Sequence, residues 1–263
     1  MPHKDSSNPE QLAARLRHAY SGGAVAPLRD GLDPGDGVSA YRVQDINTRH
    51  WVEQGRRIVG RKIGLTAKAV QAQLGVDQPD YGVLFADMEV ADGGVLSISR
   101  TLQPKAEAEV ALILKSDITA SDPGRGDVLG AADCAVAAIE IVDSRISDWK
   151  IGFADTVADN GSSAFFVLGK ERKALDGLDL FTCGMVLELN GEIASLGAGA
   201  ACLGHPLDAA AWLAKVMVAN GTPLRAGDIV LTGALGPMVP VTRNDRVTAT
   251  IGGLGSVSFS VGA

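Results

Sequence analysis

The sequence predicts an α+β protein in which a small N-terminal helical lobe precedes a larger β-rich domain. Two stretches with helical spacing of apolar residues stand near the N-terminus. Short apolar runs bounded by turn residues dominate the chain after residue 57. The chain also carries 32 glycines and 11 prolines, a composition that favours many tight turns and therefore much β structure. We expect the lobe to cover residues 1–56 and the β-rich domain to cover residues 57–263.

The N-terminal lobe is expected to consist of two helices. The first is predicted over 9–20, where Leu12 and Leu16 recur at helical spacing. The second is predicted over 39–56, with Ser39 as its N-cap. A change in residue pattern after Gly55 marks the boundary of the lobe.

The β-rich domain is expected to alternate short strands with a few helices. The strands are predicted at 57–64, 83–85, 95–98, 105–115, 164–168, 185–189, 192–195, 228–232, 246–251 and 256–261. Asn190-Gly191 between two of these strands is a strong signal for a hairpin with a type I′ turn. Helices are predicted at 67–74, 128–135 and 206–220, and His205 is interpreted as a structural residue near the cap of the last one.

Composition excludes several classes of partner. Acidic residues outnumber basic ones 31 to 24, which gives a net charge of −7. This balance, without a Lys/Arg cluster, argues against binding to nucleic acid or to an anionic membrane surface. The three cysteines form no CxxC pair, so neither a disulfide framework nor a thiolate zinc site is expected. No apolar run approaches the ~18 residues of a membrane-spanning helix, and the N-terminal segment lacks the apolar core of a signal peptide. We therefore expect a cytoplasmic protein.

The most informative pattern is a set of three glutamates. Glu107 and Glu109 lie two apart in the predicted strand 105–115, so their side chains share one face. Glu140 lies inside an apolar run, where an unpaired carboxylate is costly unless a cation or a hydrogen bond compensates it. Three clustered carboxylates form an all-oxygen site that selects a hard ion such as Mg²⁺, Mn²⁺ or Ca²⁺. The alternative from the residues alone is a solvated strand face on which Glu107 and Glu109 pair with Lys105 and Lys115.

Other polar residues have both functional and ordinary interpretations. Lys62, at a strand-to-turn junction, could hold a substrate carboxylate or could be a surface lysine. Asp80, in an expected loop, could be a general acid/base or an ordinary turn residue. The polar stretch 155–163 could be a substrate-binding loop or a simple turn. The sequence has no GxSxG elbow, no GxGxxG after a strand and no Walker A loop, so these three kinds of active site are not supported.

Five segments, in this order along the chain, share one pattern. They are Lys62–Thr66, Gly75–Phe85, Gln103–Glu109, Glu140–Ile146 and Gly233–Val239. With them the chain closely resembles the 2-keto-4-pentenoate (2-hydroxypenta-2,4-dienoate) hydratases of the fumarylacetoacetate hydrolase superfamily, from about residue 10 to the C-terminus. One departure is Gly161, where the resemblance leads us to expect alanine and where the lost methyl group should loosen the loop.

The resemblance implies a fold, a site and an assembly. The fold is a mixed β-sandwich-like roll of the superfamily's C-terminal type, with the N-terminal helices packed alongside a catalytic domain. The assembly is a homo-oligomer, often a pentamer or decamer, which can associate with a related decarboxylase or with the downstream aldolase. The implied metal ligands for Mg²⁺ or Mn²⁺ are Glu107, Glu109 and Glu140; the implied catalytic residues are Lys62 and Asp80; the implied substrate-binding residues are Ser162 and Leu84.

The implied reaction is the addition of water to a 2-hydroxy-2,4-dienoate in aromatic meta-cleavage catabolism. We expect Lys62 to hold the substrate carboxylate and to lower the pKa of Asp80. The main alternative is 4-oxalocrotonate decarboxylase of the same superfamily, which shares the lysine and the glutamates but tends to lack the equivalent of Asp80. A carbon–carbon hydrolase is less well supported, because His205 lies outside the matched motifs. A non-catalytic partner subunit with a structural Ca²⁺ is the alternative from a different class.

Overall fold

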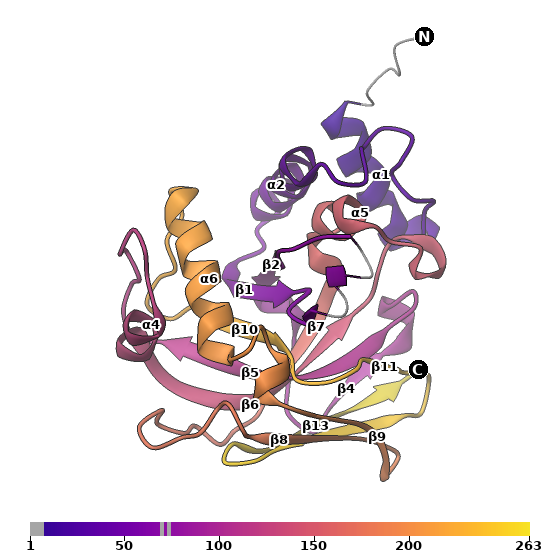
Figure 1. Ribbon diagram of the computed structural model, residues 1–263. Coiled ribbons are helices and arrows are strands. Elements are labelled where there is room, and N and C mark those ends of the chain that lie inside the picture. The colour runs from indigo at the N-terminus through magenta and orange to yellow at the C-terminus, as the bar shows by residue number, and fades with distance from the viewer. Residues whose placement is uncertain (1–7, 69–70, 73–74) are drawn as a thin grey trace.

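The computed structural model describes residues 8–68, 71–72 and 75–263. Two β-sheets lie against each other, and the helices α1 (Pro9–Gly22), α2 (Gly37–Glu53) and α5 (Phe153–Ala158) lie on the far side of the larger sheet (Figure 1). The larger sheet has eight strands in the order β2-β1-β10-β5-β6-β7-β3, with β11 paired to β5 off this path. The smaller sheet has five strands in the order β4-β13-β12-β8-β9. This arrangement confirms the expected α+β roll with an N-terminal helical segment.

The bounds of the elements follow the chain. The α-helices are α1 (Pro9–Gly22), α2 (Gly37–Glu53), α4 (Arg125–Ala131), α5 (Phe153–Ala158) and α6 (Pro206–Ala219). The strands are β1 (Ile58–Gly64), β2 (Asp80–Phe85), β3 (Glu89–Val90), β4 (Gly94–Ser97), β5 (Lys105–Leu114), β6 (Ala132–Val142), β7 (Ser163–Leu168), β8 (Gly184–Leu189), β9 (Glu192–Ala198), β10 (Ile229–Ala234), β11 (Val239–Pro240), β12 (Arg246–Ile251) and β13 (Gly255–Gly262).

The helical segment closes its core with residues from the middle of the chain. Leu12 and Leu16 of α1 and Val43 of α2 form one apolar cluster with Phe153 and Val157 of α5. Both helices begin at side-chain caps: Asn8 accepts from the first turn of α1, and Asp36 accepts from the Ser39 amide at 3.0 Å. The predicted cap of α2 was therefore wrong by three residues, because the carboxylate of Asp36 is the acceptor and Ser39 the donor. The division of the chain at residue 56 stays a prediction.

The two faces of the large sheet bury different clusters. In strand β5, Ala108, Val110 and Leu112 point toward the small sheet and join its apolar side chains. The alternate residue Ala111 belongs to a second cluster on the opposite face, together with Phe166 of β7 and Leu231 of β10. Because side chains alternate along a strand, Glu107 and Glu109 share the face of Ala111. This is the face that carries the candidate site.

Most predicted elements are present, with three informative differences. Asp80 is the first residue of β2 and pairs with Gly64 of β1, rather than lying in a loop. The helix expected at 128–135 begins and ends earlier, as α4 (Arg125–Ala131), because strand β6 begins at Ala132. The polar stretch 155–163 includes the end of helix α5 and a 3-10 turn, Asn160–Ser162. The capping role expected of His205 is confirmed: its Nδ1 accepts from the Leu207 amide at 3.0 Å.

Two expectations fall on residues outside the described part of the chain. The helix predicted at 67–74 includes 69–70 and 73–74, and the interpretation of the N-terminal segment includes 1–7. Among the residues that are described, no helix combines the length and apolar character needed to cross a membrane.

Candidate metal centre and active site

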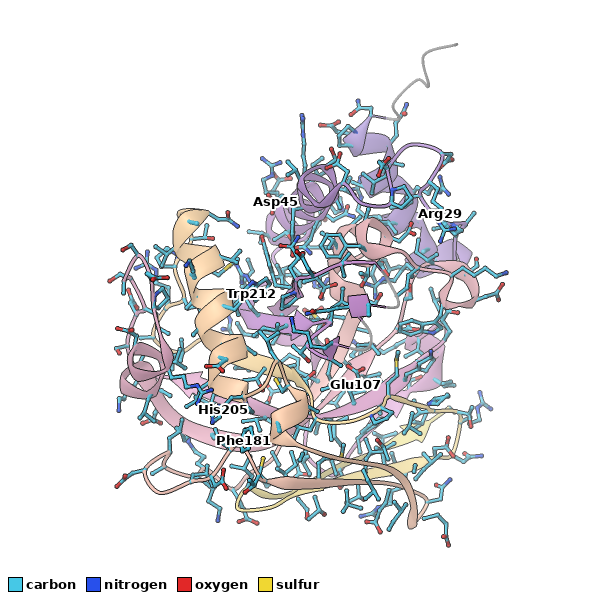
Figure 2. All side chains as sticks on the ribbon, viewed as in Figure 1. Arg29, Asp45, Glu107, Phe181, His205 and Trp212 are labelled. Carbon is cyan, nitrogen blue, oxygen red and sulfur yellow. The ribbon has the colours of Figure 1, made fainter. Side chains whose placement is uncertain are left out.

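Strand pairing brings the three glutamates together. Glu107 of β5 lies directly opposite Glu140 of β6, and Glu109 is two residues further along β5 on the same face. Each offers one carboxylate oxygen to a cluster whose members lie within 4.8 Å of one another. Figure 2 places Glu107 between the N-terminal helices and the small sheet. The cluster therefore forms at the centre of the large sheet, where the backbone is most constrained.

Two of the three carboxylates, those of Glu109 and Glu140, are buried and poorly satisfied by hydrogen bonds. Glu109 and Glu140 have no exposed surface. Glu109 Oε2 accepts from the Gly233 amide at 2.8 Å, but Glu109 Oε1 and both oxygens of Glu140 accept no hydrogen bond from the described residues. Buried polar atoms are nearly always hydrogen-bonded in folded proteins, so orphaned carboxylate oxygens point to a missing partner. A cation with all-oxygen preference fits this donor set.

Repulsion and burial act together on these groups. Burial, and then the neighbouring Glu140 carboxylate, raises the pKa of Glu107 to about 7. Burial also raises the pKa of Glu109 well above its ordinary value, and Glu140 and Glu107 add to the rise. Both shifts describe carboxylates that resist ionising without a compensating positive charge. A bound divalent cation would supply that charge.

Lys62 is the positive group that the chain itself provides. Lys62 lies on β1, between its register partners Gly82 of β2 and Leu231 of β10. Leu231 pairs in turn with β5, so Lys62 shares the sheet face of the glutamates. Its Nζ is 3.3 Å from Glu140 Oε2, although the two are not aligned as a hydrogen bond. Burial lowers the pKa of Lys62, but the surrounding carboxylates, Glu140 foremost, outweigh this and raise it. Lys62 is therefore a buried lysine whose charged form is stabilised by the surrounding carboxylates.

Asp80 lies next to Lys62 on the same face of the sheet. It is 1% exposed, and the Thr156 hydroxyl donates to its Oδ2 at 3.3 Å. A β-carbon at Gly64 would stand 2.2 Å from Asp80 Oδ1, so only glycine leaves room for this carboxylate. Burial raises the pKa of Asp80, and Lys62 with the Thr156 hydrogen bond offsets the rise only in part. Lys62 thus lowers the pKa of Asp80 in the expected direction, while burial raises it by more.

A turn with an unusual backbone conformation, Asn160–Ser162, lies against one side of the site. Asn160, Gly161 and Ser162 have φ values of 60°, 61° and 53°, in the left-handed region that non-glycine residues rarely adopt. A β-carbon at Gly161 would stand 3.0 Å from Lys62 Cε, so the turn lies directly against the lysine side chain. The Asn160 side chain holds the turn to β2 through two bonds to Val83, at 2.7 and 3.0 Å. The non-glycine residues Asn160 and Ser162 adopt this conformation only because the surrounding contacts hold them there, and such strain is common beside functional sites.

The two remaining candidates lie at the edge of this arrangement. Ser162 is buried, and its hydroxyl donates to Asp159 Oδ2 at 3.3 Å. Leu84 is fully buried in the apolar cluster that shares the face of the glutamates. Its partner in the strand register is Gly60 of β1. The structure therefore gathers Lys62, Asp80 and the glutamates closely, and places Ser162 and Leu84 beside them.

Sequence reasoning missed the residues that support the site. Thr156 contacts Asp80, and the Gly233 amide contacts Glu109. Asp159 accepts from Ser162 and forms a buried ion pair with Arg145, whose Nε lies 2.6 Å from Asp159 Oδ1. Thr156 and Asp159 lie in the polar stretch that the sequence singled out, so density of short polar side chains was the available signal. No local pattern identifies the Gly233 amide.

Comparison with known proteins identifies the family to which the chain belongs. Residues 47–262 match the family described as fumarylacetoacetate (FAA) hydrolase C-terminal. The chain belongs to this family. It is 58% identical over 250 residues to "2-keto-4-pentenoate hydratase 1" of Dechloromonas aromatica (strain RCB), covering 95% of each chain. It is 56% identical over 254 residues to "2-keto-4-pentenoate hydratase" of Burkholderia vietnamiensis (strain G4 / LMG 22486), covering 96% of this chain and 97% of the relative.

A solved structure of the family is also very similar. It is a 4-oxalocrotonate decarboxylase from Pseudomonas putida G7 complexed with magnesium and adipate. The TM-score is 0.91 at 38% identity, over 97% of this chain and 98% of that one. The family resemblance inferred from the motifs is thereby confirmed, and so is the fold that it implies.

Proposed function

We propose that this protein is a metal-dependent hydro-lyase that adds water to 2-hydroxypenta-2,4-dienoate (2-oxopent-4-enoate) and forms 4-hydroxy-2-oxopentanoate. The carrying observation is the set of orphaned carboxylate oxygens on Glu109 and Glu140, next to a buried Lys62–Asp80 pair. The full-length similarity to named 2-keto-4-pentenoate hydratases supports the choice of substrate class. Such a reaction belongs to the catabolism of aromatic rings by meta-cleavage.

Glu107, Glu109 and Glu140 would hold one divalent cation, Mg²⁺ or Mn²⁺. The all-oxygen donors favour these hard ions over zinc, and three protein ligands leave positions of an octahedral ion open. When bound, the ion supplies Lewis acidity toward the oxygens of a 2-oxo acid. The magnesium in the related decarboxylase structure supports a divalent ion in this family.

Lys62 and Asp80 would position the substrate and move protons. A buried ammonium that stays charged is suited to hold the C1 carboxylate of the dienoate. Burial raises the pKa of Asp80, which makes its carboxylate a stronger base and suits it to accept and return a proton. In the proposed sequence C5 gains a proton as the enol becomes a ketone, the hydroxyl of water adds to C4, and C3 gains the remaining proton.

Ser162 and Leu84 would complete the substrate site. The Ser162 hydroxyl donates to Asp159. Ser162 ends the turn that lies against Lys62, the residue proposed to hold the substrate carboxylate. Leu84 would contribute apolar surface toward the hydrocarbon part of the dienoate. We further propose a cytoplasmic homo-oligomer, a pentamer or decamer, that associates with a related decarboxylase or with the downstream aldolase.

Decarboxylation of 4-oxalocrotonate is the second candidate. The TM-score of 0.91 to a decarboxylase favours it as an alternative. The higher identity to the named hydratases, 58% against 38%, favours hydration. Both reactions would use the same carboxylate cluster, so metal binding alone does not separate them.

A product assay with two substrates tests the proposal. The protein is incubated with 2-hydroxypenta-2,4-dienoate and, in parallel, with 4-oxalocrotonate, each with Mg²⁺ and with EDTA. We expect 4-hydroxy-2-oxopentanoate from the first substrate with Mg²⁺ and none with EDTA. Release of CO₂ from the second substrate without hydration of the first would replace the hydratase by the decarboxylase.

A further inference from the structure

A cavity lies between the N-terminal helices and the β3–β7 edge of the large sheet. Its volume is about 470 Å³, within the range of small-molecule sites. Tyr20 and Trp51 line it from the helical segment, and Phe85 and Phe165 line it from the β-rich domain. Neither the three glutamates nor Lys62 and Asp80 line it. It is therefore separate from the candidate active site, although the turn 160–162 lies between the two.

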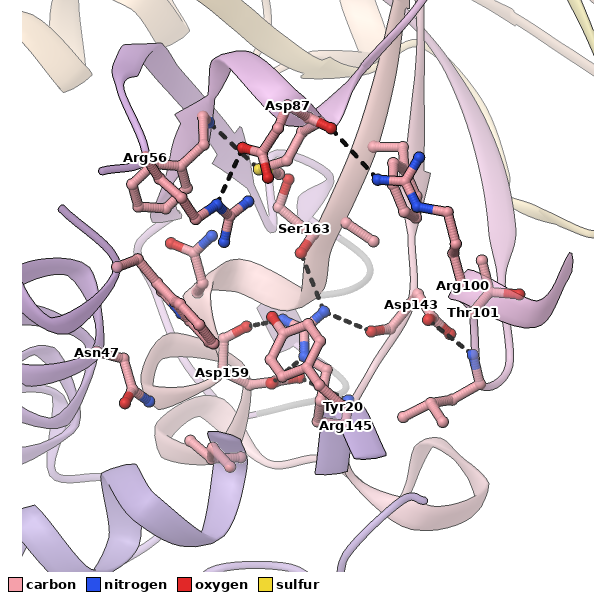
Figure 3. A pocket seen from close by; sticks show the side chains of 18 of the residues that line it. Tyr20, Asn47, Arg56, Asp87, Arg100, Thr101, Asp143, Arg145, Asp159 and Ser163 are labelled. Atoms are coloured by element: carbon pink, nitrogen blue, oxygen red, sulfur yellow. Dashed lines mark hydrogen bonds and ion pairs between the residues drawn. The ribbon is translucent and has the colours of Figure 1, made fainter. Parts of the chain in front are cut away.

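Two arginines at one end of this cavity carry unused hydrogen-bond donors. Figure 3 shows Arg56 and Arg100 on either side of Asp87. Arg56 Nε donates to Asp87 Oδ1 at 2.9 Å, and Arg100 makes one long bond of 3.4 Å to the Asp87 backbone oxygen. Each guanidinium has five N–H donors, so most of them are free. Arg100 forms no ion pair with any carboxylate among the described residues, so its guanidinium donors are not taken up by an acidic side chain.

Aromatic rings hold both guanidinium groups in place. The Arg56 guanidinium lies 4.2 Å from the Phe85 ring centroid and 5.4 Å from that of Trp51. The Arg100 guanidinium lies 4.5 Å from the Phe165 ring centroid. Such stacking fixes the plane of a guanidinium and leaves its edge free for a two-pronged bond to a carboxylate.

The other two acidic side chains of the cavity, Asp143 and Asp159, already accept hydrogen bonds from other partners. Asp143 uses its oxygens to accept from the amides of Leu102 and Gln103, at 2.8 and 2.6 Å. Asp159 is paired with Arg145 at the opposite end of the cavity (Figure 3). Ser163 also lines the cavity, and its buried hydroxyl has no hydrogen-bond partner among the described residues. The free polar capacity is therefore mainly cationic, next to aromatic walls.

We propose that this cavity is a binding site for a small planar aromatic carboxylate. The carboxylate would bind the free edges of Arg56 and Arg100, and the ring would pack against Trp51, Phe85 and Phe165. The ligand is outside the metal centre, so the proposal does not rest on the reaction assigned to that centre. Because the turn 160–162 contacts Lys62 on its other side, an occupant of this cavity would lie one segment away from the active site.

Calorimetric titration of the metal-loaded full-length protein with benzoate tests this proposal. We expect one benzoate per chain, and about tenfold or weaker binding of benzamide, which keeps the ring and loses the charge. The variants Arg100→Gln and, separately, Arg56→Gln should each weaken benzoate binding about tenfold or more. Arg172→Gln is the matched control, since Arg172 is also a surface arginine paired to an aspartate at 2.9 Å but lies outside the cavity. It should bind like the wild type.

Two results would overturn the proposal. The first is an absence of benzoate binding to the wild-type protein, or equal binding by Arg100→Gln and wild type. The second is loss of binding in Glu109→Gln with retention in Arg100→Gln, which would place the benzoate at the metal centre. Thermal melting of each variant verifies folding, and Arg100→Gln is informative on its own if Arg56→Gln does not fold. Since benzoate binding is measured without turnover, failure here leaves the hydratase proposal to its own assay.

Discussion

Two clusters of buried charge in this protein are built in opposite ways. At the metal centre Glu109 Oε1, both oxygens of Glu140 and Asp80 Oδ1 lack hydrogen bonds from the described residues. In the neighbouring Arg145–Asp159 pair, by contrast, the guanidinium donates to Asp159 and to the carbonyls of Asp143 and Ser163. Asp159 Oδ2 in turn accepts from the Arg145 amide and from two serine hydroxyls. The two clusters share the segment that carries Ser162.

This difference distinguishes a structural ion pair from a cluster that is suited to bind a ligand. A buried ion pair that satisfies its own hydrogen bonds is self-contained, and removing one member leaves an uncompensated charge. A buried cluster whose polar atoms lack hydrogen bonds lowers the stability of the ligand-free protein, and a ligand that binds to it restores that stability. The Arg145–Asp159 pair therefore supports the turn structurally, whereas the glutamates with Lys62 and Asp80 have the properties expected of a ligand-binding site.

The largest expected effect is on the rate, at the unsatisfied cluster. Asp80→Asn should lower kcat by about 10²–10⁴-fold, because the amide does not exchange the proton of the general acid/base. Its thermal stability should not fall, since Asp80 Oδ1 has no hydrogen bond to lose and burial already disfavours the charge. Steady-state kinetics and thermal melting measure the two quantities. A loss of less than about tenfold in kcat would remove Asp80 from the proton transfer.

At the satisfied pair the largest effect should be on stability. Asp159→Ala should destabilise the fold by about 3–5 kcal/mol, because Arg145 would remain buried without its partner. Asp133→Ala is the matched control, since Asp133 pairs with Arg172 on the surface and should cost about 1 kcal/mol or less. Urea unfolding of both variants measures the difference. Equal losses would mean that the buried pair is not a structural support.

The pH dependence of stability should also separate the metal-free from the metal-bound protein. Glu107 ionises at about 7 in the folded state against an ordinary value of 4.5, so the folded state binds its proton more tightly than the unfolded state does. The metal-free protein should therefore lose stability as pH rises from about 5 to about 7, on the order of 1–3 kcal/mol. Saturating Mg²⁺ should abolish this loss. Urea unfolding at several pH values, with EDTA or Mg²⁺, provides the measurement, and a metal-free protein that gains stability over this range would contradict it.

The smallest expected effect concerns the turn between the clusters. Gly161→Ala places a β-carbon 3.0 Å from Lys62 Cε at a residue with φ +61°. The left-handed backbone should cost about 1 kcal/mol, and the lysine must shift by a few tenths of an ångström. We expect a decrease in kcat/KM of several-fold with kcat affected more than metal affinity. Gly177→Ala, at a φ of +71° with open space around it, is the control for backbone strain alone.

Local periodicity was enough to predict part of the site. The spacing of Glu107 and Glu109 in an alternating strand put both on one face, and the apolar run around Glu140 predicted its burial. The face-to-face register of Glu107 and Glu140 was not predictable, because it depends on the connection of residues 115–131 and on pairing across the sheet. The position of Asp80 on β2 was missed for a similar reason. The preceding Asp77 and Pro79 are typical of a loop, but pairing with Gly64 extends the strand to Asp80.

The supporting residues were beyond sequence reasoning because they act through long-range contacts. Arg145 is buried among the Asp159 carboxylate and three backbone carbonyls that accept from its guanidinium. The helical segment was predicted as a lobe, but its apolar core includes Phe153 and Val157 from α5. Neither contact has a local signature, and the short helix α5 was hidden in a stretch of polar residues.

Titration of the metal-free protein with Mn²⁺, followed by calorimetry, tests the central claim most directly. If the orphaned carboxylates are a cation site, wild-type protein should bind one Mn²⁺ per chain, and Glu109→Gln should bind it at least about tenfold more weakly while remaining folded. Wild-type protein that binds no Mn²⁺, or Glu109→Gln that binds it equally well, would contradict the account.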